Sequence, residues 1–163
     1  MPYYFNLISF YGFPISDYKD INKLMDWFLS VCSEQDRAEI RDNWCLNLVT
    51  NEDGVELLHF PDNDDGNYYY ESIEWIASRL GLDSHDTGHG FPMPDDMKYT
   101  MYIGIKIASY DQGELAKQCL YKSGCLLKPN PSNSDRHRLK KILGPLADSA
   151  VNIFLPDGCL CCT

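Results

Sequence analysis

The sequence has no apolar run of the roughly 18 residues that a helix needs to cross a bilayer. Its first residues, Met1-Pro2-Tyr3-Tyr4, contain neither a basic segment nor a small-residue cleavage site, and a secretory signal needs both. We therefore expect a protein that works in the cytoplasm, away from membranes.

Recognisable catalytic motifs are also missing. The sequence contains no phosphate-binding loop, no GxSxG element and no dinucleotide-binding glycine pattern, each of which has a fixed spacing set by its chemistry. These absences favour a binding protein over an enzyme, and no cofactor is expected.

The number and spacing of the cysteines give no sign of disulfide bonds. The chain has seven cysteines, an odd number, and no CxxC pair, which disfavours a disulfide framework and favours a reducing compartment. Three of them, Cys159, Cys161 and Cys162, fall in the last five residues, where Leu160 occupies the position that a prenylation box requires to be cysteine. We expect residues 159–163 to form a tail whose thiols can be replaced without loss of folding.

Basic residues are scarce in the first part of the chain. Residues 1–97 contain 19 acidic and five basic side chains, a net charge of −14, whereas residues 98–163 contain five acidic and nine basic ones, a net of +4. The first part should repel phosphate backbones, so direct nucleic-acid binding is not expected. It suits a basic protein, such as a nuclease or another toxin whose groove is lined with Lys and Arg.

Apolar spacing indicates an α+β fold. Alternating or two-sided apolar patterns mark strands, and i, i+3, i+4, i+7 patterns mark helices. The order is strand, helix, strand, strand, helix, strand, over residues of about 3–11, 17–32, 46–50, 56–60, 73–80 and 100–108, with a second helical segment at 33–43. This order predicts a ferredoxin-like βαββαβ sandwich, an antiparallel sheet with helices on one face.

Local signals predict where these elements begin and end. The first strand is apolar on both faces, which is typical of an interior strand, and Gly12 and Pro14 are expected to end it. Ser16 is the expected cap of the first helix, and Ser33 with Asp36 fits a capping box for the second helical segment. A short turn at 51–54 joins the strands at 46–50 and 56–60 into a hairpin. Gly81 is expected to end the helix at 73–80, and a loop is expected from about 83 to 98.

Further elements follow this core. We expect a short helix near 113–121, a basic helix at 134–143 and a strand at 150–155 that could extend the sheet at an edge. The expected organisation is a core domain at 1–110, a C-terminal extension at 111–158 packed on it, and the cysteine-rich tail at 159–163.

The predicted partner-binding surface surrounds the second strand of the hairpin. Carboxylates bracket this strand, and three tyrosines follow, a residue type that often anchors protein interfaces. The predicted site residues are Glu52, Asp53, Glu56, Asp62, Asp64, Asp65, Tyr68, Tyr69 and Tyr70. The pattern resembles in type the small acidic immunity proteins and phage inhibitors that neutralise toxins by occlusion, although no motif identifies a family.

Two other functions remain open at this point. His85 and His89, with Asp83 as a third ligand, could bind zinc in a metal-dependent enzyme, although Gly88 and Gly90 argue against the helix that would bring the imidazoles together. A regulatory module that dimerises through its sheet is the other alternative, so a homodimer is possible.

Overall fold

The computed structural model describes residues 6–42, 46–59, 68–86, 101–110 and 130–157. The chain divides into two compact units: residues 1–16 with 85–163 form unit 1, and residues 17–84 form unit 2. Unit 2 is continuous in sequence, whereas unit 1 is assembled from the two ends of the chain. The predicted division at residue 110 stays a prediction.

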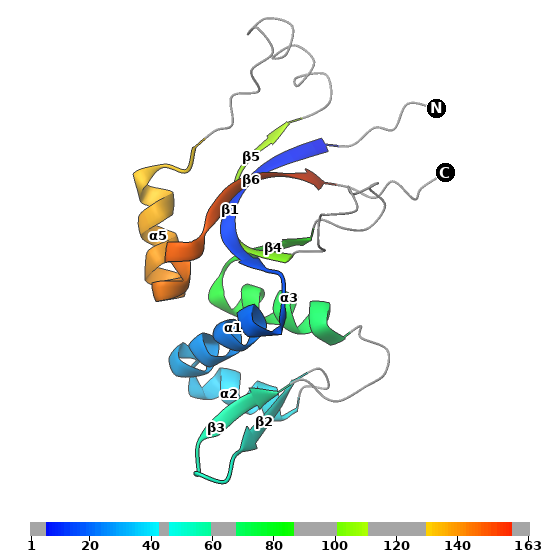
Figure 1. Ribbon diagram of the computed structural model, residues 1–163, viewed down its shortest axis with the longest axis vertical. Helices are drawn as coiled ribbons and strands as arrows, with labels where there is room; N and C mark the ends of the chain where they lie inside the picture. Colours follow the sequence, from blue (N-terminus) through cyan, green and yellow to red (C-terminus); the bar gives the residue numbers. More distant parts are fainter. Residues whose placement is uncertain (1–5, 43–45, 60–67, 87–100, 111–129, 158–163) are drawn as a thin grey trace, which may run out of the picture. The chain divides into compact units, whose positions relative to one another are not determined.

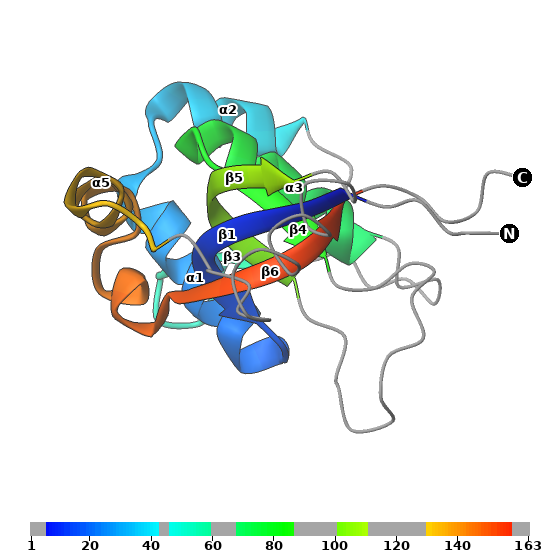
Figure 2. The same ribbon diagram turned by 90° about the horizontal axis from the view of Figure 1, so that it is seen from above.

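Unit 1 is built on a four-stranded antiparallel sheet in the order β4-β5-β1-β6 (Figures 1 and 2). Its strands are β1 (Asn6–Ile15), β4 (Asp83–Asp86, crossing the boundary between the units), β5 (Met101–Tyr110) and β6 (Val151–Asp157). β1 pairs antiparallel with β5 on one side and with β6 on the other. The strand expected at 150–155 is confirmed, and it lies at the edge of the sheet.

The two faces of this sheet are both apolar. One carries a buried cluster formed by Ile8, Phe10, Tyr102 and Leu155. On the other face, the α5 helix (Asn133–Leu143) places the Arg136 guanidinium 5.4 Å from the ring centre of Tyr11. After α5 the chain continues in a 3-10 helix, η1 (Gly144–Ser149), before it enters β6. Burial on both faces explains why β1 and β5 are apolar at successive positions.

Two glycines allow β1 and β5 to come together. Gly12 is paired with Gly104 across the two strands. A Cβ atom on Gly12 would lie 2.6 Å from the carbonyl oxygen of Ile103, and one on Gly104 would lie 2.8 Å from the carbonyl carbon of Tyr11. Real Cβ atoms essentially never approach other atoms this closely, so these positions require residues without side chains.

The ferredoxin-like strand order is not what the described residues form. The hairpin strands pair with each other in a separate two-stranded sheet, and β6 takes the place beside β1. The sequence pattern correctly indicates that β1 is an interior strand, but apolar spacing does not say which strand lies next to it. The coarser prediction of an α+β protein holds, with four helices among the described residues.

Unit 2 contains three helices and a hairpin. These are α1 (Tyr18–Val31), α2 (Glu34–Arg41), the hairpin strands β2 (Asn47–Thr50) and β3 (Glu56–His59), and α3 (Tyr68–Leu80). Ile21, Leu24, Met25 and Phe28 form the buried stripe of α1, as their spacing predicts. The ring of Phe28 meets that of Trp75 on α3 edge to face, with 5.7 Å between ring centres.

Residues close to the helix ends determine where the helices of unit 2 begin and end. The predicted capping box of α2 is present, because Ser33 accepts from the Asp36 amide while Asp36 accepts from the Ser33 amide. Gly81 ends α3 with a φ of 71°, a left-handed conformation that glycine adopts without strain. The cap of α1 is Asp17 rather than the expected Ser16, since the Asp17 carboxylate accepts from the Asp20 amide at 2.9 Å.

Two strand boundaries differ from the prediction. β1 runs through Gly12 and Pro14, which were expected to end it. Its pairing with β6 ends at Gly12, so Pro14, which has no N–H to donate, interrupts no hydrogen bond between these two strands. Residues 83–86, expected to begin a loop, form β4 instead, because an edge position in a sheet tolerates polar side chains.

Replacing Gly104 by alanine should lower the free energy of unfolding by about 1–3 kcal/mol, because the new methyl group would collide with the β1 backbone, which cannot move aside. Urea unfolding measures the change. The matched control is Ser109→Ala on the same strand at an exposed position, where we expect a change within about 0.5 kcal/mol. Equal effects of the two substitutions would show that the close strand approach is not required.

Tyr102 should make unit 1 sensitive to alkaline pH. Burial raises the pKa of its phenol above the ordinary value of 10.0, so the unfolded chain loses this proton at a lower pH than the folded protein. The stabilisation is complete below pH 10 and is lost as pH rises through the folded pKa. In urea unfolding from pH 8 to 11, wild type should therefore lose stability relative to Tyr102→Phe, and a constant difference between the two would contradict this.

Candidate protein-binding surface

The net negative charge of the chain comes from one of the two units. Unit 2 carries 16 acidic and five basic residues, a net charge of −11, whereas unit 1 carries eight acidic and nine basic residues, a net of +1. The surplus of carboxylates noticed along the first 97 residues thus coincides with a structural unit. Such a charge distribution produces a local field even where the rest of the molecule is nearly neutral.

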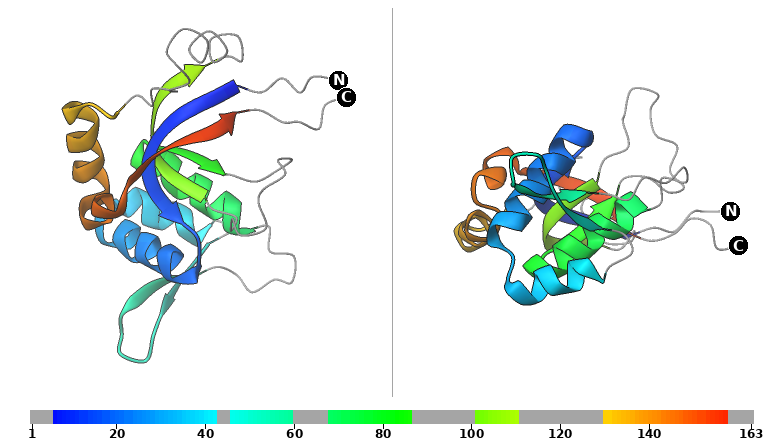
Figure 3. Two further views of the ribbon diagram at one scale, coloured as in Figure 1. Left: turned by 45° about the horizontal axis from the view of Figure 1, so that its top comes forward. Right: turned by 90° about the horizontal axis from the view of Figure 1, so that it is seen from below.

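The hairpin presents two of these carboxylates at a well-defined turn. The side-chain oxygen of Asn51 accepts from the backbone amides of Asp53 and Val55, both at 3.0 Å. Gly54 has a φ of 77°, and the Asn51 amide donates to the Val55 carbonyl at 2.9 Å. Glu52 and Asp53 are therefore exposed on an ordered turn that extends beyond α1 and α2 (Figures 1 and 3).

Arg37 fastens this hairpin to the helices. From α2, its guanidinium donates to the Glu56 carboxylate on β3 and, at 3.2 Å, to the carbonyl of Leu29 on α1. The hydrogen bond to Glu56 is the main reason why the pKa of Arg37 is raised. Glu56, one of the predicted docking residues, is thus paired within the unit, whereas the side chains of Glu52 and Asp53 form no ion pair with described residues.

A second arginine works in the same way between α2 and α3. Arg79 pairs with Glu39 and lies 4.0 Å from Asp36, and its guanidinium sits 5.2 Å from the ring centre of Trp75. Two of the five basic residues of the unit are therefore used to hold acidic side chains inside it. Most carboxylates among the described residues of unit 2 nevertheless remain exposed.

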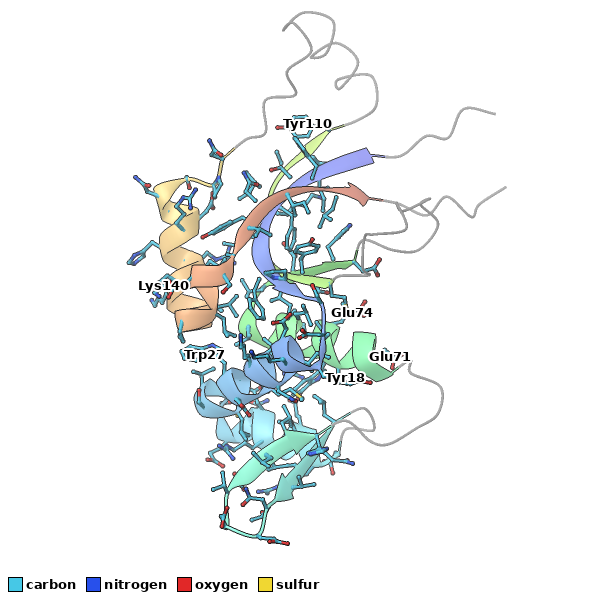
Figure 4. All side chains as sticks on the ribbon, viewed as in Figure 1. Tyr18, Trp27, Glu71, Glu74, Tyr110 and Lys140 are labelled. Carbon is cyan, nitrogen blue, oxygen red and sulfur yellow. The ribbon has the colours of Figure 1, made fainter. Side chains whose placement is uncertain are left out.

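The exposed acids are distributed over the whole of unit 2. They lie on or next to α1, α2, α3, β4 and the hairpin, and Figure 4 labels two of them, Glu71 and Glu74 on α3. Among the described residues, the set comprises Asp17, Asp26, Glu34, Asp42, Glu52, Asp53, Glu56, Glu71, Glu74 and Asp83. The unit is therefore acidic on several sides, and the hairpin is distinguished by its projection rather than by a larger number of charges.

The structure describes only some of the predicted docking residues. Asp62, Asp64 and Asp65 lie outside the described residues. The backbone of Tyr68, Tyr69 and Tyr70 forms the start of α3, and their side chains lie outside the description. The role predicted for these six residues stays a prediction.

The hairpin also has an exposed apolar side that the sequence analysis did not single out. The register pairs Leu48 with Leu58 on one face and Val49 with Leu57 on the other. Leu58 is buried, whereas Val49 is 40% exposed and Val55, beside the turn, is 52% exposed. The signal was present in the sequence, because both strands carry apolar residues at successive positions, not only at alternating ones.

The predicted zinc site is only partly described. Asp83 and His85 lie on β4, where Asp83 is exposed and His85 is half-buried with its ring 6.2 Å from that of Phe10. His89 lies outside the described residues. Within the part of the chain that is described, no group of three or more His, Cys, Asp or Glu residues could hold a metal ion.

The remaining predictions from the sequence concern cysteines and membranes. The tail at 159–163 and the helix expected at 113–121 lie outside the described residues. Cys32 is a free, half-buried thiol whose pKa is raised by burial. None of the described helices has the length and apolar character needed to span a membrane.

Comparison with known proteins finds no matching family model, no matching curated protein and no matching solved structure. The residues of the two units are therefore the basis for a proposal on function.

Arg37→Ala should loosen the hairpin, because Glu56 and the Leu29 carbonyl both lose a charged donor. We expect a loss of about 1–2 kcal/mol in unfolding free energy and faster amide hydrogen exchange in β2 and β3. The control is Lys140→Ala, which removes an exposed pair with Asp148 at 2.8 Å and should cost less than about 0.5 kcal/mol. Unchanged exchange in the hairpin would contradict the role of Arg37.

Proposed function

We propose that this chain is a binding protein that inhibits a basic protein partner by occlusion, docking through unit 2 with the β2–β3 hairpin at the centre of the interface. The observation that supports this most is the confinement of the net charge of −11 to unit 2. The partner class is a toxin or nuclease whose functional groove is basic.

Electrostatics favours such a partner over others. An acidic unit and a basic groove attract each other over distances of about a Debye length, which accelerates their encounter and suppresses association with acidic surfaces. A nuclease groove must carry Lys and Arg to hold phosphates. Carboxylates presented on a projecting element can occupy the same positions and exclude the substrate.

The hairpin is suited to this role because it is ordered before binding. The Asn51 side chain holds the turn, and Arg37 holds β3 to the helices. A preorganised element loses less conformational entropy on association than a flexible one. Glu52 and Asp53 therefore reach the partner at little ordering cost.

The test begins with the full-length chain, cross-linked to its partner in a lysate of its own source, followed by reconstitution with the purified partner. We expect a partner of net positive charge that loses activity at equal molar amounts of the two proteins. The association rate should fall at least about tenfold between 0.05 and 0.5 M NaCl. A neutral or acidic partner bound independently of salt would contradict the proposal.

Charge reversal locates the interface within unit 2. The double substitution Glu52→Lys and Asp53→Lys should weaken binding by about 100-fold or more, because close charge pairs across interfaces are strongly coupled. Glu71→Lys with Glu74→Lys on α3 is the matched control, since it changes net charge equally at exposed positions. An equal loss in the control would show that docking is not centred on the hairpin.

A further inference from the structure

We propose that the outer face of the hairpin, formed by Val49, Val55 and Leu57, is the apolar anchor of the docking surface and receives an apolar side chain that the basic partner presents between Lys or Arg residues. This inference rests on the proposed function and adds to it the chemistry of the contact. It concerns a face that the acidic residues do not form.

The geometry of the hairpin separates two faces. Leu48 and Leu58 are paired on the face that also carries Glu56, and this face is turned to the helices through the contact of Glu56 with Arg37. Val49 and Leu57 are the next pair along the ladder, so their side chains point away from the helices. Leu57 is half-buried and Val49 is exposed.

Exposed large apolar side chains are few in the described residues. There are five, and four of them lie in unit 2. Val49 and Val55, at 40% and 52% exposure, lie on the hairpin, whereas Tyr18 and Val31 lie at opposite ends of α1. The hairpin is thus the element on which exposed apolar groups come together, next to the carboxylates of Glu52 and Asp53.

Charge decides which occupant fits this face. A second copy of the chain would bring another unit of net charge −11 against the first, and like charges across an interface oppose association. A cationic surface meets Glu52 and Asp53 favourably at the rim. An apolar group at the centre with charged residues around it is the usual arrangement of an energetically important contact.

Two synthetic peptides of equal charge test the anchor on the full chain. One alternates Lys with Leu and the other alternates Lys with Ser. At 0.15 M NaCl, we expect the Lys–Leu peptide to bind about tenfold more tightly, as expected when one or two apolar groups are buried. Methyl NMR shifts should be largest at Val49, Val55 and Leu57 and small at Val31.

Substitutions at exposed positions isolate the apolar contribution. Val49→Thr with Val55→Thr keeps residue size and strand preference, and it should abolish the preference for the Lys–Leu peptide while retaining Lys–Ser binding. Val49→Ile with Val55→Ile should increase the preference. Val31→Thr, at a position that is 46% exposed on α1, is the matched control and should leave it unchanged.

The outcomes separate the anchor from the proposed function. If both peptides bind equally well and lose affinity with salt, the apolar anchor is wrong, whereas docking of a basic partner on the acidic residues is still supported. The same conclusion follows if Val31→Thr removes the preference as fully as the hairpin substitutions do. If neither peptide binds, the proposed function fails as well. Self-association in sedimentation that disappears in the Val→Thr variant would identify a second copy as the occupant and overturn the inference.

Discussion

The guanidinium of Arg37 is the interaction on which the organisation of unit 2 depends. It connects α2 with β3 through Glu56 and with the last turn of α1 through the Leu29 carbonyl. In a unit with 16 carboxylates and five cations, mutual repulsion opposes compactness. Each structural cation therefore has to satisfy more than one acceptor, and Arg79 does so between α2 and α3. The carboxylates that these arginines do not neutralise give the unit its field.

Local structure could be predicted from the sequence because its causes are local. The capping box at Ser33 and Asp36, the turn at Asn51 to Gly54 and the glycine that ends α3 each depend on a few neighbouring residues. The strand at 101–110 could be predicted from its alternating apolar residues. The partners of β1 could not be predicted in this way, because a strand that is apolar on both faces pairs equally well with any suitable neighbour. β4 was missed for a related reason, since its polar residues are stabilised by an edge position rather than by their own pattern.

The candidate docking surface also has parts that could be predicted from the sequence and parts that could not. The acidic character of the region and the hairpin that presents Glu52 and Asp53 follow from composition and turn chemistry. The pairing of Glu56 with Arg37 joins residues that are 19 positions apart, and no spacing rule connects them. Successive apolar residues in both hairpin strands indicate a second apolar face, but only the register shows that Val49 and Leu57 form it, because a shift of one strand by a single position would turn the same residues to the helices.

The discontinuity of unit 1 has a consequence for the order in which the protein is made. Ile8 pairs with Ser109 and with Leu155, so β1 is synthesised long before either neighbour leaves the ribosome. Residues 17–84 are contiguous, so their contacts join segments that are closer in sequence than those joined by β1, and a sheet closed by distant segments forms slowly. We therefore expect the acidic unit to fold during translation while the apolar strand β1 is still unpaired. The charge of that unit offers such an intermediate protection against aggregation that the strand itself cannot provide.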